Sequence, residues 1–192
     1  KGMNYFTTLD LTKGYYQVPL DPASAEFTAF STSRNHYQFK RLSFGLKNAP
    51  GAFQREMQEV LKGFDPKRVL VYIDDILIMS ATFEEHIDLI LRVLRTLEQA
   101  SMKVNPDKCS WIHPEVQFLG HVIGANGLRK SDDYMDTVRQ YPLPQNVKEL
   151  RSFLGVINYQ RKFVPQCSDV CKPLTVWLGK SDKTSLDWTP EM

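Results

Sequence analysis

The sequence predicts an α+β fold in which an antiparallel sheet packs on helices and a small helical region follows. The apolar run Val69–Met79 carries two adjacent aspartates at its centre, which is typical of a hairpin whose turn holds short polar residues. The segment Tyr5–Leu11 has the composition of a second strand, and from about residue 126 the apolar spacing becomes helical. We therefore predict a body over residues 1–125 and a helical region over 126–192.

Composition limits the class of protein only loosely. The 192 residues carry a formal net charge of +2, so any case for nucleic-acid binding rests on where Lys and Arg lie. No apolar run approaches the ~20 residues of a membrane span, and the first residues lack a signal-peptide layout. We expect an intracellular protein without a membrane partner. Cys109, Cys167 and Cys171 match no common zinc spacing, which favours free thiols.

The first half of the chain combines strands with one helix. After Tyr5–Leu11, Asp21-Pro22 can open a helical turn, and residues 26–30 and 36–39 alternate as a hairpin does. Asn48 is the expected N-cap of the next helix, whose apolar face is predicted from its i, i+4, i+7 and i+8 spacing. That face consists of Phe53, Met57, Val60 and Leu61.

A second helix begins at a capping box, with Thr82 as N-cap and Glu85 reaching back to its amide. Its predicted buried stripe runs to about Ala100 and consists of Phe83, Ile87, Ile90, Leu91, Leu94 and Leu97. Residues 103–109 form a polar loop or short strand, and residues 116–123 a strand that enters a hairpin at the turn signal 124–127.

Three helices are expected beyond residue 126. The first covers about 132–140, and the second begins at a capping box formed by Asn146 and Glu149. Its buried face consists of Val147, Leu150, Phe153, Leu154 and Ile157. The third covers about residues 169–178.

The carboxylates in the two predicted strands call for a chemical explanation. Ionised Asp in an apolar setting is costly unless a cation or hydrogen bonds compensate it. If Asp10 meets Asp74 and Asp75 in one sheet, their repulsion favours divalent cations, and oxygen donors favour Mg²⁺. Two such ions can promote in-line phosphoryl displacement. The structural alternatives are a hairpin turn for Asp74-Asp75 and a strand-end cap for Asp10.

Several motifs in order resemble the reverse transcriptases of long-terminal-repeat retroelements, most closely the gypsy-like group (Metaviridae). Residues 6–17 resemble the first catalytic motif of that family, and residues 44–50 its nucleotide-side loop and helix. Tyr72-Ile73-Asp74-Asp75 resembles its metal-binding hairpin, and Phe118-Leu119-Gly120 its primer grip. Residues 150–159 and Pro173-Leu174 are similar to its thumb and connection. The matches cover nearly the whole chain.

The resemblance implies a polymerase palm over residues 1–125, with part of the fingers at about 22–45. It also implies a helical thumb and the start of the connection over 126–192. Asp10 and Asp74 would be the direct ligands of two Mg²⁺ ions, with Mn²⁺ as a substitute. The Leu11 carbonyl would assist them, and Asp75 would be the third catalytic carboxylate.

The resemblance also assigns residues to the substrates, an RNA or DNA template with its primer and deoxynucleoside triphosphates. Tyr15 falls at the steric gate against a ribose 2′-hydroxyl, Phe44 would line the nucleotide, and Lys108 would assist pyrophosphate departure. The rival interpretations are a core tyrosine and a surface lysine. The predicted primer-template contacts are Tyr72, Phe118, Leu119, Gly120, Arg151, Arg161 and Lys162. For the last three, a solvated helix face is the alternative.

Some features depart from the family pattern. Ser43 stands where the family usually has Pro, and we expect the upstream fingers and the ribonuclease H domain to lie outside the chain, so the isolated piece could be inactive. Protease, ribonuclease H and integrase are the expected polyprotein partners. The expected location is the cytoplasm, in virus-like particles, and a nuclear phase is compatible with this expectation. The leading hypothesis is an RNA-directed DNA polymerase. The alternatives are a non-catalytic remnant that binds nucleic acid and, less favoured, a metal-dependent nuclease.

Overall fold

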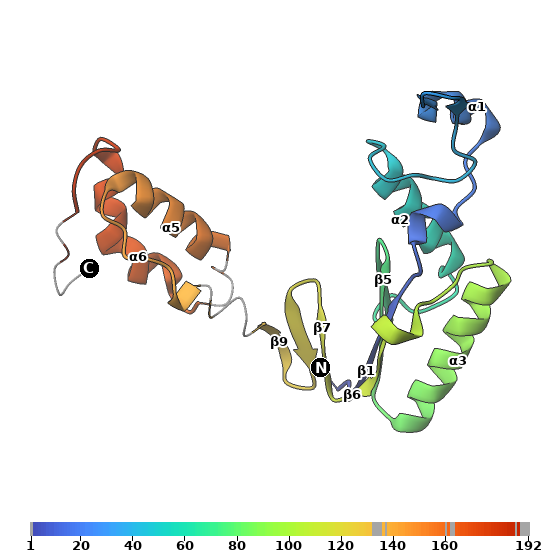
Figure 1. Cartoon of the computed structure of the whole chain (residues 1–192). Helices are drawn as coiled ribbons and strands as arrows, with labels where there is room; N and C mark the ends of the chain where they lie inside the picture. The colour runs from blue at the N-terminus through green and yellow to red at the C-terminus, as the bar shows by residue number, and fades with distance from the viewer. Residues whose placement is uncertain are drawn as a thin grey trace. The chain divides into compact units, whose positions relative to one another are not determined.

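The computed structural model describes residues 2–131, 136, 138–159, 161, 164–186 and 188. The chain divides into two compact units, residues 1–128 and 129–192. Within the first unit, helices and an antiparallel sheet pack together (Figure 1), which confirms the predicted α+β class. Among the described residues, no helix combines the length and the apolar character that a membrane crossing requires.

The central sheet of the first unit has the strand order β4-β5-β1-β6. Its strands are β1 (Tyr5–Asp10), β4 (Val69–Tyr72), β5 (Asp75–Ser80) and β6 (Ser110–His113). Every neighbouring pair runs antiparallel, and β1 lies between β5 and β6. The sheet therefore brings together segments from both ends of the first unit.

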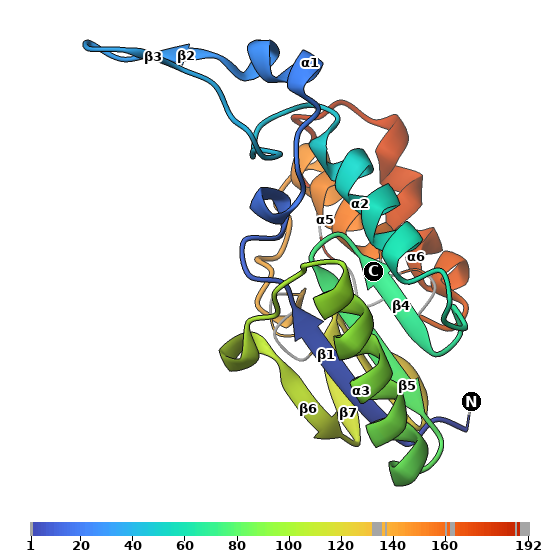
Figure 2. The ribbon, with the colours of Figure 1, turned by 90° about the vertical axis from the view of Figure 1, so that its right-hand side faces the viewer.

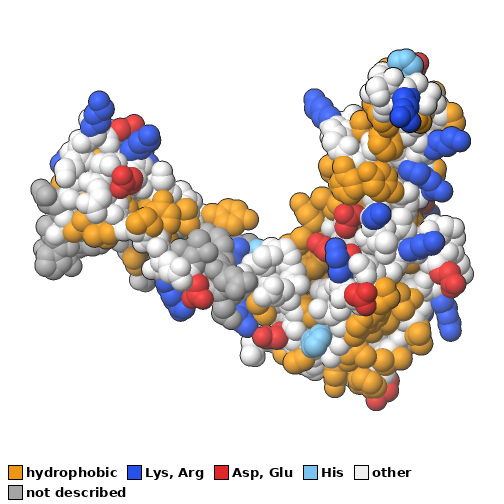
Figure 3. Space-filling view, in the orientation of Figure 1, with side chains coloured by type: hydrophobic (Ala, Val, Ile, Leu, Met, Phe, Trp, Pro, Cys, Tyr) orange, Lys and Arg blue, Asp and Glu red, His pale blue; other side chains and the backbone are white. Residues whose placement is uncertain are grey.

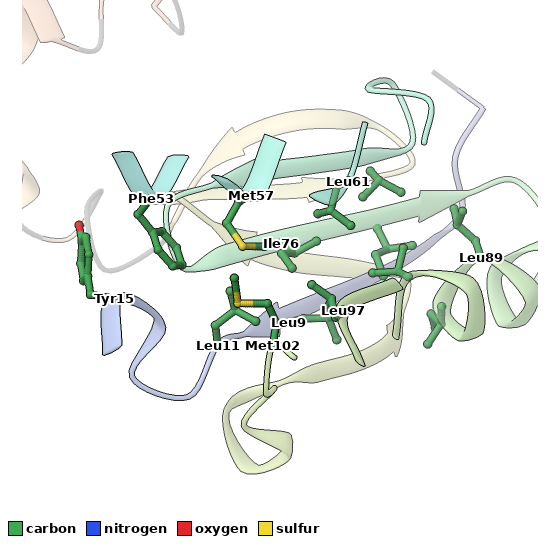
Figure 4. Packing of buried hydrophobic residues seen from close by; sticks show 14 of the residues in the cluster. Leu9, Leu11, Tyr15, Phe53, Met57, Leu61, Ile76, Leu89, Leu97 and Met102 are labelled. Atoms are coloured by element: carbon green, nitrogen blue, oxygen red, sulfur yellow. The ribbon is translucent and has the colours of Figure 1, made fainter. Parts of the chain in front are cut away.

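Two helices cover one face of this sheet, α2 (Ala49–Val60) and α3 (Phe83–Gln99). Figure 2 shows α3 lying across β1 and β5 with α2 beside it. The cluster between them and the sheet includes Leu9 and Ile76 from the strands, Phe53 and Met57 from α2, and Leu97 from α3 (Figure 4). Each of these side chains is at most 1% exposed, and burying one such side chain is worth about 1.5–3 kcal/mol.

The opposite face of the sheet packs against a second hairpin. Side chains alternate between the two faces of a strand, so Phe6 and Leu77 point away from the helices and contact Val116. Val116 lies in β7 (Glu115–Phe118), which pairs with β8 (His121–Gly124). A third strand, β9 (Gly127–Lys130), follows β8 in that sheet.

The structure corrects several predicted details in the first unit. Residues 26–28 form a 3-10 turn, η2 (Glu26–Thr28), so the hairpin consists only of β2 (Phe30–Ser31) and β3 (His36–Tyr37). Thr28 explains this, because its hydroxyl donates to the Ala25 carbonyl at 2.7 Å and accepts from the Phe39 amide at 2.9 Å. In the same region α1 (Pro22–Ala25) begins where expected, with Asp21 as its N-cap.

The buried face of α3 is rotated from the predicted stripe. Phe83 and Leu91 are each 46% exposed, whereas His86, Leu89 and Val93 are buried. Ile90 and Leu97 are buried as predicted. On the same face, the Nε2 of His86 lies 2.9 Å from the Thr7 hydroxyl on β1. Burial, and next the Arg68 charge, lower the pKa of His86. The helix thus offers a second apolar stripe, formed by Leu89, Ile90, Val93 and Leu97, and this stripe faces the sheet.

Two predicted caps are only half right. Thr82 accepts from the Glu85 amide at 3.3 Å, but the Glu85 carboxylate pairs with Arg68 at 3.0 Å instead of reaching back. Asn48 occupies the N-cap position of α2 without a side-chain cap bond.

The segment predicted as one strand over residues 116–123 is wrong as stated. It turns at Leu119-Gly120, where both residues have positive φ (51° and 73°), and so forms β7 and β8. Strand β6 and the 3-10 turns η1 (Gly14–Gln17) and η3 (Pro106–Lys108) were not predicted.

The second unit is built on α5 (Val147–Tyr159), α6 (Cys167–Thr175) and the 3-10 turn η5 (Val176–Gly179). The Asn146 side chain accepts from the Glu149 amide at 3.0 Å, as the predicted capping box requires, and Glu149 accepts from the Gln145 amide at 2.8 Å. Val147, Leu150 and Leu154 form the core with Leu174 and Leu186. Most of the helix predicted over 132–140 lies outside the described residues.

Candidate active site

The sheet brings the three predicted carboxylates together. Asp10 at the end of β1 is the direct register partner of Asp75 at the start of β5. Asp74 precedes Asp75 in the turn between β4 and β5, and its carbonyl accepts from the Leu11 amide at 3.2 Å. Residues more than sixty positions apart in sequence therefore share one end of the sheet because β1 and β5 are neighbours.

The turn that carries Asp74 is strained. Tyr72 pairs with Asp75, so Ile73 and Asp74 form a two-residue loop, and of these two only Ile73 has a positive φ (54°). This is the pattern of a type II′ turn, whose first central position favours Gly. A β-branched residue there costs on the order of 1–3 kcal/mol. Strain of this kind, next to paired carboxylates, marks a candidate functional site.

One oxygen of Asp74 is buried without a partner. Asp74 Oδ1 has no hydrogen-bond partner, although buried polar atoms normally have one. Gly14 makes room for it, because a Cβ added at Gly14 would lie 2.1 Å from this oxygen and 2.9 Å from Phe53 Cζ. The requirement for Gly at residue 14 was not predicted beyond its role in a turn.

The electrostatics of the site disfavour ionised carboxylates. Burial, and then the charges of Asp10 and Asp75, raise the pKa of Asp74. Burial and the charge of Asp10 likewise raise the pKa of Asp75. In the absence of a cation, the folded state therefore disfavours the ionised forms of Asp74 and Asp75.

The donor set fits a divalent cation in its chemistry. Carboxylate and carbonyl oxygens are the ligands that Mg²⁺ prefers, and Asp74 Oδ1 is an unsatisfied oxygen. Over the described residues, no group of three or more His, Cys, Asp or Glu side chains is arranged to hold a metal ion. The predicted ligands need only two side chains, Asp10 and Asp74, together with the Leu11 carbonyl.

Backbone contacts hold Asp10 in place. Its carbonyl accepts from the Asn105 amide at 2.9 Å, and Leu11 forms a β-bridge with Val104. The Gln17 side chain donates to the carbonyls of Thr12 and Lys103 at 2.7 and 2.9 Å and accepts from the Lys103 amide. This clamp joins segments 86 residues apart, so no local pattern could have identified it.

Tyr15 and Phe44 lie together beside the carboxylates. The Tyr15 ring is buried, with its centroid 4.8 Å from that of Phe44 and 5.2 Å from that of Phe53. Figure 4 shows Tyr15 at the end of the core cluster, next to Phe53. Burial, and next the Asp74 charge, raise the pKa of Tyr15. Phe44 is 57% exposed, and its predicted contact with the nucleotide stays a prediction.

The aromatic contacts continue away from Tyr15. Phe44 and Tyr16 meet edge to face at 5.4 Å, and Tyr16 stacks on Phe39 at 6.4 Å. Figure 3 shows hydrophobic and basic side chains sharing the surface over α1 and α2. Lys108 lies at the end of η3 and is exposed, so its predicted role in pyrophosphate departure stays a prediction.

The predicted primer-grip residues form a turn of their own. Phe118 ends β7, Leu119 and Gly120 make the tight turn, and Leu119 is 44% exposed. Tyr72, at the end of β4, is 52% exposed. Their contacts with nucleic acid stay predictions.

The basic residues predicted to contact nucleic acid from the second unit have different partners within the protein. Arg151 donates to the Leu178 carbonyl at 2.6 Å and pairs with Asp182, so it already joins α5 to η5 and to the segment after it. Arg161 donates to the Ser168 hydroxyl. Lys162 lies outside the described residues. These internal bonds favour a structural role for Arg151 over the predicted phosphate contact, which no observation tests directly.

An antiparallel sheet with paired carboxylates at one end is the arrangement that the resemblance implied, and comparison shows that the chain belongs to the reverse transcriptase family. The family described as "Reverse transcriptase (RNA-dependent DNA polymerase)" matches residues 1–123. The predicted resemblance is thereby confirmed.

Similar curated proteins include transposon polyproteins. The chain is 42% identical over 179 residues to the "Retrovirus-related Pol polyprotein from transposon 297" of Drosophila melanogaster, covering 93% of this chain and 17% of that protein. It is 36% identical over 171 residues to the corresponding polyprotein from transposon gypsy of the same organism, covering 89% of this chain and 16% of that protein. The chain thus spans about a sixth of these relatives.

Solved structures of similar fold are foamy viral protease-reverse transcriptases. One, in complex with double-stranded DNA, has a TM-score of 0.83 and 31% identity, covering 98% of this chain and 33% of that chain. Another, in complex with an RNA/DNA hybrid, has a TM-score of 0.77 and 31% identity, covering 98% of this chain and 25% of that chain.

Replacing Gly14 by Ala should disable the site. The added Cβ would overlap Asp74 Oδ1 and press on Phe53, and a misplacement of about 1 Å at a reacting group can cost about a hundredfold in rate. Primer extension, measured in the longest natural protein that contains this chain, should fall by that order. Gly63→Ala is the control, because a Cβ there meets nothing within 4 Å. Equal rates for both variants would contradict the argument.

Replacing Asp74 by Asn should stabilise the protein at neutral pH without divalent cations. Because the folded-state pKa of Asp74 is raised, stability is lost as pH rises from about 3.9, the unfolded value, through the folded value. Asn carries no charge, so the gain in Tm should appear above this window and vanish below it.

Thermal unfolding in a chelator across pH 3.5 to 8 measures the effect, again in the longest natural protein. The control is Asp107→Asn, which removes an exposed carboxylate. A variant that is no more stable than the parent at pH 7 would show that Asp74 is not ionised at a cost.

Proposed function

We propose that the chain is the catalytic part of an RNA-directed DNA polymerase from a retrotransposon polyprotein, which extends a primer with deoxynucleoside triphosphates. The observation that carries this proposal is the register of Asp10 with Asp75, beside an Asp74 oxygen that is buried and unpartnered. Membership of the reverse transcriptase family supports it.

Asp10, Asp74 and the Leu11 carbonyl would hold the metal, with Asp75 as the third carboxylate. Two Mg²⁺ ions, or Mn²⁺ in their place, would make the primer 3′-hydroxyl a better nucleophile and offset charge on the phosphates. The contribution of the chain is to fix the carboxylates in advance. The sheet register sets Asp10 against Asp75, the Gly14 gap admits Asp74, and the Asn105 amide holds the Asp10 backbone.

Tyr15 would select the sugar. Its ring is wedged between Phe44 and Phe53, so it has little freedom to make way for a 2′-hydroxyl. Phe44, exposed next to it, would line the base or sugar of the incoming nucleotide. Lys108 would donate a proton to the departing pyrophosphate.

The template and primer would be nucleic acid of either kind, since the similar foamy viral enzymes were solved with double-stranded DNA and with an RNA/DNA hybrid. Tyr72 and the turn Phe118–Gly120 would contact the primer, with Arg161 and Lys162 on backbone phosphates. Protease, ribonuclease H and integrase domains would accompany this region in the polyprotein. Its place would be cytoplasmic virus-like particles.

Asp74→Asn should abolish primer extension. Removing one ligand of the metal site forfeits several kcal/mol of transition-state stabilisation, or about a thousandfold in rate. The measurement is extension of a primer on an RNA template by the longest natural protein that contains this chain, with Asp107→Asn as the control. Primer extension that survives in Asp74→Asn would rule out the assignment of Asp74 as a metal ligand of the polymerase. Salt-dependent binding of the hybrid by a parent that never extends it would favour the non-catalytic alternative.

Tyr15→Val should relax sugar selection. A smaller side chain leaves room for the 2′-hydroxyl, and steric discrimination of this size is worth about ten- to a hundredfold. The measured quantity is the ratio of kcat/KM for deoxyribonucleotide and ribonucleotide triphosphates. Tyr16→Val, at the neighbouring and more exposed tyrosine, is the matched control. An unchanged ratio in Tyr15→Val would refute the gate.

A further inference from the structure

Gln54, in α2, bonds to two backbone groups just before Asp74, one in β4 and one in the turn that carries the aspartates. Its Oε1 accepts from the Ile73 amide at 2.6 Å, and its Nε2 donates to the Val71 carbonyl at 3.1 Å. Both bonds are to backbone groups 17 and 19 residues away. One side chain therefore ties the helix to the hairpin immediately before Asp74.

The backbone groups that Gln54 binds have few other partners. Ile73 is a central residue of a two-residue turn, where the strand ladder offers its amide no acceptor. Val71 belongs to β4, the edge strand of the sheet, so groups on its outer side have no neighbouring strand. Gln54 supplies an acceptor to the first and a donor to the second.

The helix that carries Gln54 is itself fixed. Phe53, next in sequence, and Met57, one turn further on, are both fully buried. Figure 4 shows both side chains directed from α2 toward Ile76 on β5. Because these contacts hold α2 against the sheet, Gln54 transmits the position of a core element to the turn.

The two Gln54 bonds hold Ile73 in a backbone conformation that is unfavourable for a β-branched residue. Its φ of 54° suits Gly rather than a β-branched residue, and relaxing it would rotate the peptide that leads into Asp74. The Asp74 carboxylate has little room to shift, because its Oδ1 lies so close to Gly14 that a Cβ there would fall 2.1 Å from it. Holding the turn thus holds the carboxylate.

We propose that Gln54 is a positioning residue for the metal-binding carboxylates, acting through the Ile73 backbone without touching substrate. The inference rests on the proposed polymerase function and deepens it. Residues that orient a metal ligand typically affect metal affinity or activity by about 10- to 100-fold when replaced.

The test replaces Gln54 by Met, which is of similar length and helix propensity but makes neither bond. The control is Gln58→Met, one turn along α2 at an exposed position. Both are made in the longest natural protein that contains this chain. The readouts are Tm, the fraction of active enzyme from a burst titration, kcat, KM for primer-template, and the Mg²⁺ concentration that gives half-maximal rate.

A positioning role predicts that Gln54→Met needs about 10- to 100-fold more Mg²⁺, or loses that factor in kcat per active site, while KM for primer-template stays the same. A merely structural role predicts a lower Tm and a smaller active fraction with unchanged kcat and Mg²⁺ dependence, and this result would overturn the proposal. Gln58→Met should match the parent in every readout.

A second variant keeps the test decisive if Gln54→Met folds poorly. Adding Ile73→Gly relieves the positive φ, so Gln54→Met/Ile73→Gly should recover part of the Mg²⁺ response if Gln54 works by holding that turn. No coupling between the two changes in a double-mutant cycle would count against the proposal. A parent protein without extension activity would overturn the proposed function and this inference with it, whereas an active parent with an unaffected Gln54→Met variant would overturn the inference alone.

Discussion

The structure depends on the antiparallel register of β1 with β5, which sets Asp10 opposite Asp75. Like charges at adjacent strand positions repel one another, and burial adds to the cost, as the raised pKa of Asp74 records. The fold confines this cost to one end of the sheet. The carboxylates are tolerable there because Leu9, Ile76 and the two covering helices form a large core immediately behind them.

Side chains and backbone on separate segments keep the carboxylates where the register puts them. Gly14 leaves room for Asp74, the loop around Asn105 holds the Asp10 carbonyl, and Gln54 bonds the strained turn at Ile73. These contacts join parts of the chain that are far apart in sequence. The site therefore depends on contacts from several parts of the first unit, among them α2 and β1.

Sequence patterns succeeded where the physics is local and failed where it is not. The apolar run with its central aspartates, the N-cap at Thr82 and the capping box at Asn146 each depend on neighbouring residues, and each was predicted. The buried face of α3 was misplaced because the helix carries two overlapping apolar stripes, and packing on the sheet selects the one beside the His86–Thr7 contact. Arg151 proved to be engaged within its own unit. Hydrophobic spacing gives no sign of either partner.

The sequence by itself determined the α+β class, the membership of the reverse transcriptase family and the identity of the three carboxylates, because each is written in short motifs and local periodicity. Only the tertiary structure decided that Asp10 faces Asp75 and that one oxygen of Asp74 is left without a partner. It also decided that Gln17 bonds Lys103 and that Gln54 bonds the turn at Ile73. The reason is that strand register and helix packing bring together residues whose separation along the chain conceals their contact.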